Sequence, residues 1–252
     1  MSAMPSALRL IPLPGFPEVE PGADLAELIR HAARGADIGL ANNVIVVCQK
    51  IISKAEGRLV ALADVEAGDE ALEIAKDHHR DPRQVEVVLR ESRRIVRRGN
   101  GVLITETRHG FVCANSGVDL SNAPGPDIAI LLPEDPDASA RRLYEALSGP
   151  AGPTPVIISD TFGRPWREGL VDVALGCAGL APIRDDRGSR DRAGRELIVT
   201  QLATADQLAA AAGLLMWKSA GVPVVVIEGF PIAGDGSVKD ALLREPSTDL
   251  FR

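Results

Sequence analysis

The segment VIVVCQKIISK, residues 44–54, joins a run of apolar residues to a run of polar and charged ones. The uninterrupted apolar run Val44–Cys48 is typical of a strand that is buried on both faces of a sheet. The side chains that follow such a strand are carried to one edge of the sheet. We therefore expect a polar cluster at that edge, made of Gln49, Lys50, Ser53 and Lys54.

Other apolar runs and helical patterns mix along the chain without a strict β-α-β rhythm. Strands are expected at 7–11, 101–105, 110–114, 128–132, 155–159, 197–202 and 222–227. Helices are expected at 24–35, 67–80, 82–93, 137–148 and 206–218. The mixture predicts an α/β fold of mixed α+β type. We expect one domain over residues 1–252, with the Pro- and Gly-rich segment 149–155 as the candidate link between two interlocked lobes.

Composition limits the classes of function. The 252 residues include 35 acidic and 28 basic side chains, so the net charge of −7 argues against broad binding to nucleic acid or to an anionic membrane. No apolar run approaches the roughly 18 residues of a membrane span, and the N-terminus has no signal-peptide pattern. The three cysteines form no CxxC pair. We expect a soluble protein of the reducing cytoplasm.

Common signatures of phosphate chemistry are absent: the sequence has no GxxxxGK[ST] and no GxGxxG that opens a helix. Two polar clusters after apolar runs offer oxygen ligands for Mg²⁺ or Mn²⁺ instead. Asp160 and Thr161 follow the strand expected at 155–159, and Asp119 and Asn122 lie in the small polar segment 115–122. The alternative interpretation is that both clusters are turns stabilised by their own side chains.

Two basic clusters offer contacts for anions. Lysine is scarce, with five residues against 23 arginines, so Lys50 and Lys54 are notable as mobile charges for a phosphoryl group. Arg164 and Arg167 lie in a Gly-rich segment, and guanidinium groups bind carboxylates or phosphates in a bidentate manner. A solvated lysine pair and arginines in surface ion pairs are the alternatives.

Several segments, taken in order, resemble the stand-alone form of the coenzyme F420-0:γ-glutamyl ligase family. They are PGFPEVEPGADLAELI at 14–29, VIVVCQKIISKAEGR at 44–58, VLRES at 88–92, CANSGVDLSN at 113–122, VIISDTFGRPWREG at 156–169, GRELIVT at 194–200 and AAGLLMWKSAGVPVVVIEG at 211–229. The resemblance covers nearly the whole chain, and SKAEG, ANSGVDLSN and SDTFGRPWREG are specific in combination.

The resemblance implies a GTP-dependent ligase that adds L-glutamate to coenzyme F420-0 through γ-linked amide bonds, by way of an acyl phosphate. It also implies Mg²⁺ or Mn²⁺, K⁺ as an optional further ion, and an intertwined homodimer with an unusual two-lobed fold. The implied metal ligands are Asp119, Asp160 and Thr161. The implied nucleotide contacts are Gly15, Phe16, Pro17, Glu18, Gln49, Lys54, Asn122, Met216, Trp217, Lys218, Ser219, Ala220, Gly221 and Val222. Lys54 would stabilise the phosphates, and Arg164 or Arg167 would hold substrate carboxylates or the coenzyme phosphodiester.

One segment departs from the family pattern. Archaeal members carry Gly-Glu in the loop after LLM, with the Glu as a metal ligand, where this chain has Trp217-Lys218. A charged lysine cannot ligate a cation. Either a second metal has other ligands in this protein, or the charge of Lys218 replaces part of the charge of that metal at the phosphates. The alternatives are a metal-dependent GTPase, an amide ligase with another acidic acceptor, and a non-catalytic nucleotide-binding protein.

Overall fold

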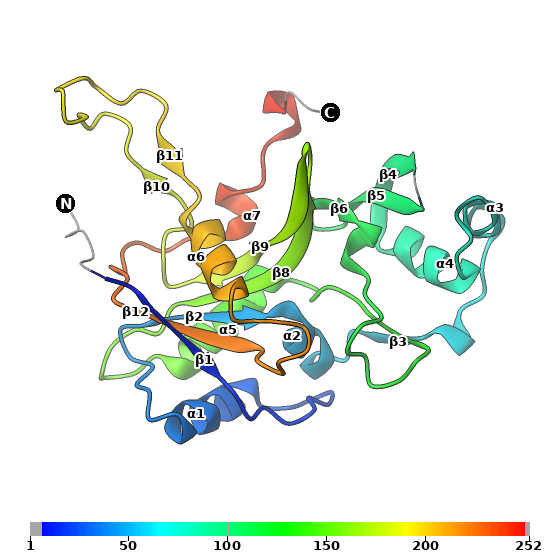
Figure 1. The fold of residues 1–252 in the computed structure, drawn as a ribbon, viewed down its shortest axis with the longest axis horizontal. Helices are drawn as coiled ribbons and strands as arrows, with labels where there is room; N and C mark the ends of the chain where they lie inside the picture. Colours follow the sequence, from blue (N-terminus) through cyan, green and yellow to red (C-terminus); the bar gives the residue numbers. More distant parts are fainter. Residues whose placement is uncertain (1–6, 100, 250–252) are drawn as a thin grey trace.

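A five-stranded sheet forms the centre of the computed structural model, which describes residues 7–99 and 101–249 (Figure 1). The strand order is β1-β12-β2-β8-β9. The strands span Arg9–Leu13, Val224–Glu228, Val44–Cys48, Val156–Arg164 and Arg167–Ala178, in that order. The pairing of β2 with β8 is parallel, and the other three pairings are antiparallel. The central position of β2 confirms the buried strand that the sequence predicts.

Helices cover both faces of this sheet. α1 (Leu25–Gly35), α2 (Gln49–Ala55) and α5 (Pro136–Leu147) pack on one face, with Ile45 and Val47 of β2 between them. α6 (Thr204–Gly213) and α7 (Val238–Ala241) pack on the other face, against Val44 and Val46. Neighbouring residues of one strand therefore enter opposite cores, which explains why the apolar runs are continuous rather than alternating.

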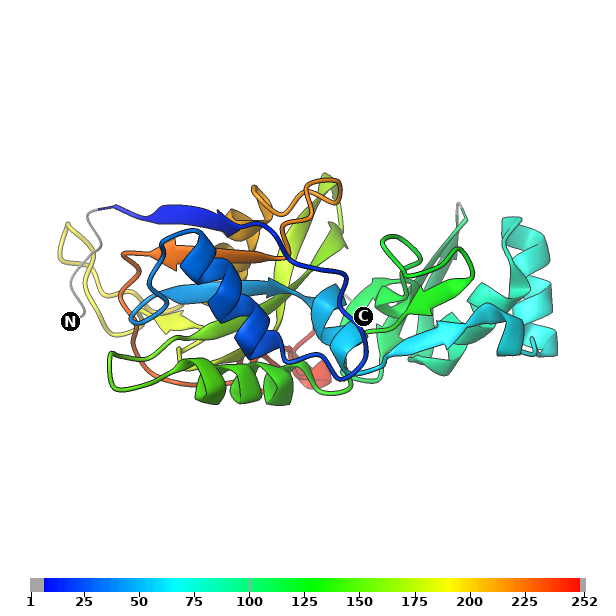
Figure 2. The same cartoon turned by 90° about the horizontal axis from the view of Figure 1, so that it is seen from below.

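Residues 59–130 form a group of smaller elements beside the main sheet (Figure 2). β3 (Leu59–Ala61) pairs with β7 (Ile128–Ile130). β4 (Ser92–Gly99), β5 (Val102–Thr107) and β6 (Val112–Ala114) make an antiparallel sheet. α3 (Asp69–His78) and α4 (Pro82–Arg90) pack over this sheet around Ile74, Val85 and Leu103. Short 3₁₀ turns occur at Leu62–Asp64, Asn115–Gly117 and Pro246–Thr248.

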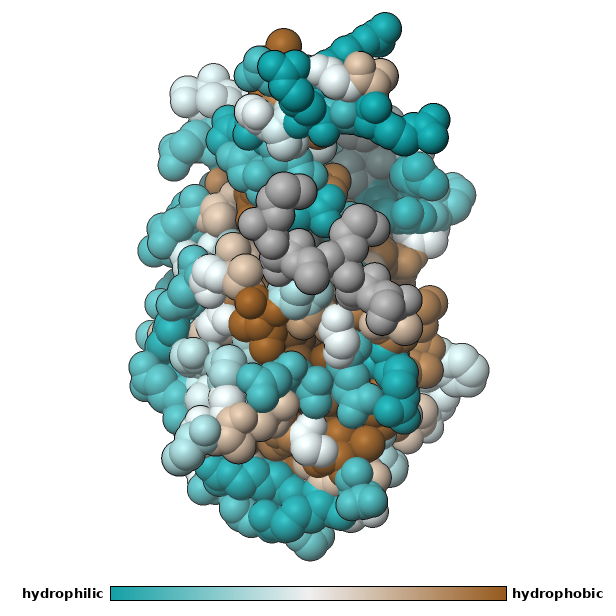
Figure 3. Space-filling model, turned by 90° about the vertical axis from the view of Figure 1, so that its left-hand side faces the viewer, coloured by the Kyte–Doolittle hydropathy of each residue, from teal (hydrophilic) through white to brown (hydrophobic). Residues whose placement is uncertain are grey.

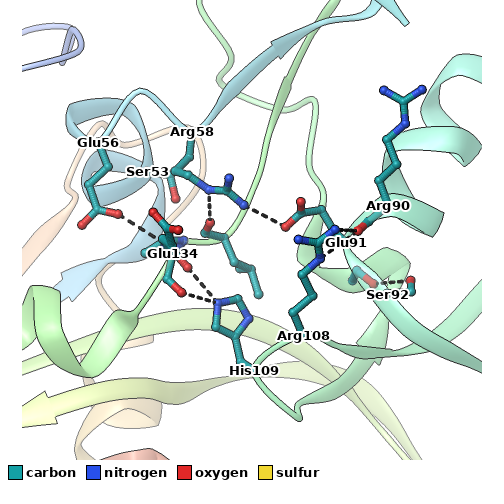
Figure 4. Close-up of polar contacts among 12 residues, drawn as sticks. Ser53, Glu56, Arg58, Arg90, Glu91, Ser92, Arg108, His109 and Glu134 are labelled. Atoms are coloured by element: carbon teal, nitrogen blue, oxygen red, sulfur yellow. Dashed lines mark hydrogen bonds and ion pairs between the residues drawn. The ribbon is translucent and has the colours of Figure 1, made fainter. Parts of the chain in front are cut away.

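A network of polar contacts joins these smaller elements to residues 132–134, in the segment that leads into α5 (Figure 4). Arg58 donates through Nε to the Leu132 carbonyl at 3.1 Å and through Nη2 to Glu91 Oε2 at 2.8 Å. His109 Nε2 lies 2.9 Å from the Pro133 carbonyl oxygen. Since residues 131–135 carry the chain back to α5, these contacts tie the end of α4 and the turn between β5 and β6 to the segment that leads into α5.

Several element boundaries differ from the sequence prediction. The break at Asp81-Pro82 is confirmed, because Asp81 caps α4 by accepting from the Arg83 N–H at 2.8 Å. The predicted helix 82–93 is too long, since Ser92 already begins β4. The predicted helix 206–218 ends at Gly213, and Trp217 beyond it is 69% exposed. The segment 149–155 joins α5 to β8, and its role as a link between lobes stays a prediction.

A two-stranded extension of β10 (Arg184–Asp185) and β11 (Gln201–Leu202) projects from the main body (Figure 1). The strand predicted at 197–202 is reduced to its last two residues, because Ile198 and Val199 are exposed and pack on no core. The face of the molecule in Figure 3 is mostly hydrophilic, with apolar residues in small groups. Across the described residues, no helix has the length and apolar character to cross a membrane.

Gly176 in β9 permits the close packing of α5 on the sheet. A Cβ at this position would lie 2.3 Å from the backbone carbonyl of Pro136. We predict that Gly176→Ala lowers the free energy of unfolding by about 3 kcal/mol, because the helix backbone must move to relieve the overlap. Denaturation in urea measures this, with Gly163→Ala in β8 as the control, since the nearest atom there is 4.0 Å away. Equal losses in the two variants would contradict the packing explanation.

Candidate functional site

A cleft of about 650 Å³ lies where the main sheet meets the smaller elements. Its walls come from the loop before α1, the junction of β2 and α2, the segment from β6 to residue 123, the β8–β9 hairpin, and the loop before β12. Of the chain's five lysines, three line the cleft: Lys50, Lys54 and Lys218. They face four carboxylates: Glu18, Asp119, Asp160 and Asp172.

The segment with Asp119 reaches the cleft through a tight turn. Gly117 has φ +69°, and a Cβ there would lie 2.7 Å from the Leu132 side chain, so this position requires glycine. The backbone of Asp119 then exchanges two hydrogen bonds with Ile130, at 3.0 and 2.8 Å. Asn122 Nδ2 donates to the Lys218 carbonyl at 3.3 Å and so links this segment to the loop before β12.

Lys50 forms the closest charge pair of Asp119. Lys50 is 8% exposed, and its Nζ lies 2.8 Å from Asp119 Oδ2 and 2.6 Å from Ser121 Oγ. Lys218 Nζ lies 3.7 Å from the same Asp119 oxygen. Burial opposes ionisation of this carboxyl, but hydrogen bonds from Lys50 and Ser121 outweigh the burial and lower the pKa of Asp119. Asp119 is therefore a charged carboxylate held between two ammonium groups.

Lys54 lies one turn further along α2 and anchors the loop before α1. It is 5% exposed, and its Nζ lies 2.5 Å from Glu18 Oε1. The spacing of four residues places Lys50 and Lys54 on the same side of the helix. α2 itself was not predicted, because its seven residues show too short a pattern to identify a helix.

Asp160 and Thr161 were predicted to follow the end of a strand, and this prediction is wrong. β8 continues to Arg164 and pairs with β9 in a long hairpin, so both residues lie within a strand. Burial raises the pKa of Asp160 to about 7, and the nearby carboxylates of Asp119 and Asp172 add to the increase. The Thr161 hydroxyl donates to Asp172 Oδ1 at 2.6 Å.

Most of the predicted nucleotide contacts and all predicted metal ligands line the cleft. These residues are Phe16, Pro17, Glu18, Lys54, Asp119, Asn122, Asp160, Thr161, Met216, Trp217, Lys218, Gly221 and Val222. The remaining predicted residues do not line it: Gly15, Gln49, Arg164, Arg167, Ser219 and Ala220. Gln49 is fully buried. Arg164 donates to the carbonyls of Glu168 and Gly169 within its own hairpin turn, so its predicted contact with substrate requires a change of side-chain position.

Lys50, Asp172 and Ser159 line the cleft but were not among the predicted site residues. The scarcity of lysine marked Lys50 as a mobile charge for a phosphoryl group, but the family resemblance assigned it no contact. Asp172 gave no signal, because it lies on the strand β9 that the Gly- and Arg-rich pattern concealed. Ser159 looked like part of an apolar strand, yet its hydroxyl is buried, has no hydrogen-bond partner among the described residues, and lines the cleft.

The cleft supplies ligands of the kind that a hard divalent cation prefers. The carboxylates of Asp119 and Asp160 and the hydroxyls of Thr161 and Ser159 are oxygen donors, and the Ser159 hydroxyl has no partner in the part of the chain that the structure describes. Within the described residues, no three His, Cys, Asp or Glu side chains are gathered closely enough to hold a metal. The types of oxygen donor fit Mg²⁺ or Mn²⁺, but among the described residues their present positions do not form a ready cation site, and the Lys50 ammonium neutralises Asp119.

The part of the chain that forms this cleft matches a known protein family. The family model of F420-0:γ-glutamyl ligase matches residues 15–229, which include every residue that lines the cleft. The chain belongs to the F420-0:γ-glutamyl ligase family. The match confirms the resemblance that the sequence motifs indicated.

Curated relatives match over nearly their whole length and bear the name coenzyme F420:L-glutamate ligase. The protein of Methanothermobacter thermautotrophicus is 47% identical over 251 residues, covering 97% of this chain and 99% of the relative. That of Methanopyrus kandleri is 45% identical over 259 aligned residues and covers both chains completely. That of Haloarcula marismortui is 39% identical over 253 residues, covering 97% of this chain and 96% of the relative.

The raised pKa of Asp160 predicts a substitution that stabilises the metal-free protein. Its folded pKa of about 7 exceeds the ordinary value of 3.8, so the wild type loses stability as the pH rises from about 4 to above 7. Asp160→Asn removes this loss. We predict a free energy of unfolding higher than wild type by on the order of 2–4 kcal/mol at pH 8, shrinking toward zero near pH 4.

Denaturation in the presence of a chelator, repeated across this pH range, measures the effect. Asp185→Asn is the control, and its effect on stability should have the opposite sign. Hydrogen bonds from Arg187 lower the pKa of Asp185 to about 2. Removing that carboxylate costs stability at neutral pH instead of adding it. If Asp160→Asn raised the free energy of unfolding by the same amount at every pH, the raised pKa of Asp160 would be contradicted.

Proposed function

We propose that this protein is a GTP-dependent ligase that adds L-glutamate to coenzyme F420-0 through γ-linked amide bonds. The main support for the proposal is the cleft, where three of the chain's five lysines face four carboxylates. The chain's membership of this family is the second support. Lysines are suited to phosphates, and the carboxylates are suited to a cation that accompanies them. The names of the curated relatives support the choice of glutamate and the coenzyme.

The first step of the proposed reaction is phosphoryl transfer from GTP to a carboxylate of the coenzyme, which gives an acyl phosphate and GDP. Lys54 and Lys218 stabilise the charge on the phosphates, since both line the same cleft and carry a mobile positive charge. Mg²⁺ or Mn²⁺, when bound by Asp119, Asp160 and Thr161, would neutralise further negative charge there.

In the second step, the amine of L-glutamate attacks the acyl carbon. A C–N bond forms, the bond to the phosphate oxygen breaks, inorganic phosphate leaves, and the amine loses a proton. The cleft contributes by holding the reacting groups together. Arg164 or Arg167, which lie on the β8–β9 hairpin beside the cleft, would bind carboxylates or the phosphodiester of the substrates after a change of side-chain position.

The proposal also includes the larger assembly. A two-lobed, intertwined homodimer in the cytoplasm and K⁺ as an optional further ion are supported by the family likeness alone. The small elements at 59–130 are compatible with a second lobe, because they have a core of their own around Ile74 and Val85.

Mass spectrometry of the coenzyme tests the proposed activity. Purified protein incubated with F420-0, L-glutamate, GTP and Mn²⁺ should lengthen the tail of the coenzyme. We predict that Lys54→Met lowers kcat/KM by about 100-fold, the usual loss for one group that stabilises transition-state charge. Asp160→Ala should abolish turnover while the protein remains folded. Lys239→Met, an exposed lysine outside the cleft, is the matched control and should behave as wild type.

The same incubation distinguishes the alternatives. Phosphate release without F420-0 would favour a GTPase, for which the unusual Trp217-Lys218 is the motivating feature. Lengthening of a different acidic acceptor, with F420-0 unchanged, would favour another amide ligase. Nucleotide binding without any product would favour a non-catalytic protein.

A further inference from the structure

The Lys50 ammonium group is paired with Asp119, the carboxylate that is predicted to ligate a cation. Lys50 Nζ contacts Asp119 Oδ2 at 2.8 Å, and only 10% of the Lys50 side chain is exposed. It also contacts the hydroxyl and the carbonyl oxygen of Ser121, at 2.6 and 3.1 Å. Lys218 approaches the same carboxylate oxygen from the opposite loop. Asp119 is thus neutralised by two lysines.

This arrangement opposes the binding of a divalent cation alone. A cation at Asp119 would meet Lys50 and Lys218 at short range, and like charges repel strongly in a partly buried site. Lys50 cannot simply withdraw, because moving a buried ammonium away from its carboxylate without another anion costs free energy. The same arrangement opposes a polyphosphate alone, since the charged carboxylate of Asp119 would remain as a negative neighbour, with the carboxyl groups of Asp160 and Asp172 in the same cleft.

A cation and a polyphosphate together remove both objections. The phosphate oxygens offer a new negative partner to Lys50 and Lys218, and Asp119 is then free to ligate the cation. We propose that Lys50, assisted by Lys218, acts as a resident counter-ion of Asp119 that makes cation and nucleotide phosphates bind cooperatively. This inference rests on the proposed function and assigns Lys50 a positioning role in it.

Titration of the protein with Mn²⁺ in the absence of nucleotide tests the inference. We expect Lys50→Met, which keeps the apolar stem and removes the charge, to bind Mn²⁺ about tenfold more tightly than wild type. Lys218→Met should shift the affinity in the same direction by a smaller factor, because this side chain is 63% exposed and its Nζ lies further away. Lys239→Met is the matched control and should leave the affinity unchanged.

A second titration, in the presence of a non-hydrolysable GTP analogue, measures the coupling. The wild type should gain at least about tenfold in Mn²⁺ affinity, a typical strength for coupled sites. Lys50→Met should gain less. Because every variant meets the same concentration of free analogue, association of Mn²⁺ with the analogue in solution cancels between them.

The outcomes separate this inference from the proposed function. If Lys50→Met and Lys218→Met bind Mn²⁺ no more tightly than wild type, the counter-ion role is wrong, even where wild type ligates glutamate to the coenzyme. If Lys50→Met does not fold, the result for Lys218→Met decides alone. If the wild type binds neither Mn²⁺ nor the analogue, the proposed function fails together with the inference.

Discussion

The parallel pairing of β2 with β8 is the constraint on which the rest of the structure depends. Its register sets Cys48 opposite Ser159, so the chain leaves β2 toward α2 at the level where β8 carries Asp160. Lys50 and Asp160 thereby reach one cleft although more than 100 residues separate them. The pairing is maintained by apolar side chains that enter both cores, so the position of the charged groups depends on the hydrophobic packing beneath them.

The cleft combines groups that oppose one another in the absence of ligand. Burial disfavours the charges of Asp160 and Asp172, whereas the lysine beside Asp119 favours its charge. Partly buried carboxylates next to ammonium groups lower the free energy of unfolding. Functional sites often carry such a loss, because a charged ligand compensates for it on binding. The cleft is in this sense complementary to a pair of opposite charges and not to either charge alone.

The sequence predicted the parts of the fold that depend on local pattern. The runs at β2 and β12 identify strands because both faces of the sheet are buried, and Asp81-Pro82 identifies a helix start through its capping chemistry. It did not predict β9, because the exposed first half of that strand has no apolar period. Asp172 was missed for this reason, and the Lys50–Asp119 pair could not be predicted, because tertiary pairing of strands decides which distant polar segments meet.

Anomalous X-ray scattering from crystals grown with Mn²⁺ and a non-hydrolysable GTP analogue tests the central claim most directly. The account predicts a Mn²⁺ peak within about 2.3 Å of a carboxylate oxygen of both Asp119 and Asp160, with Lys50 Nζ moved from Asp119 to a phosphate oxygen. A Mn²⁺ peak away from these two carboxylates, or an intact Lys50–Asp119 pair beside bound nucleotide, would contradict it.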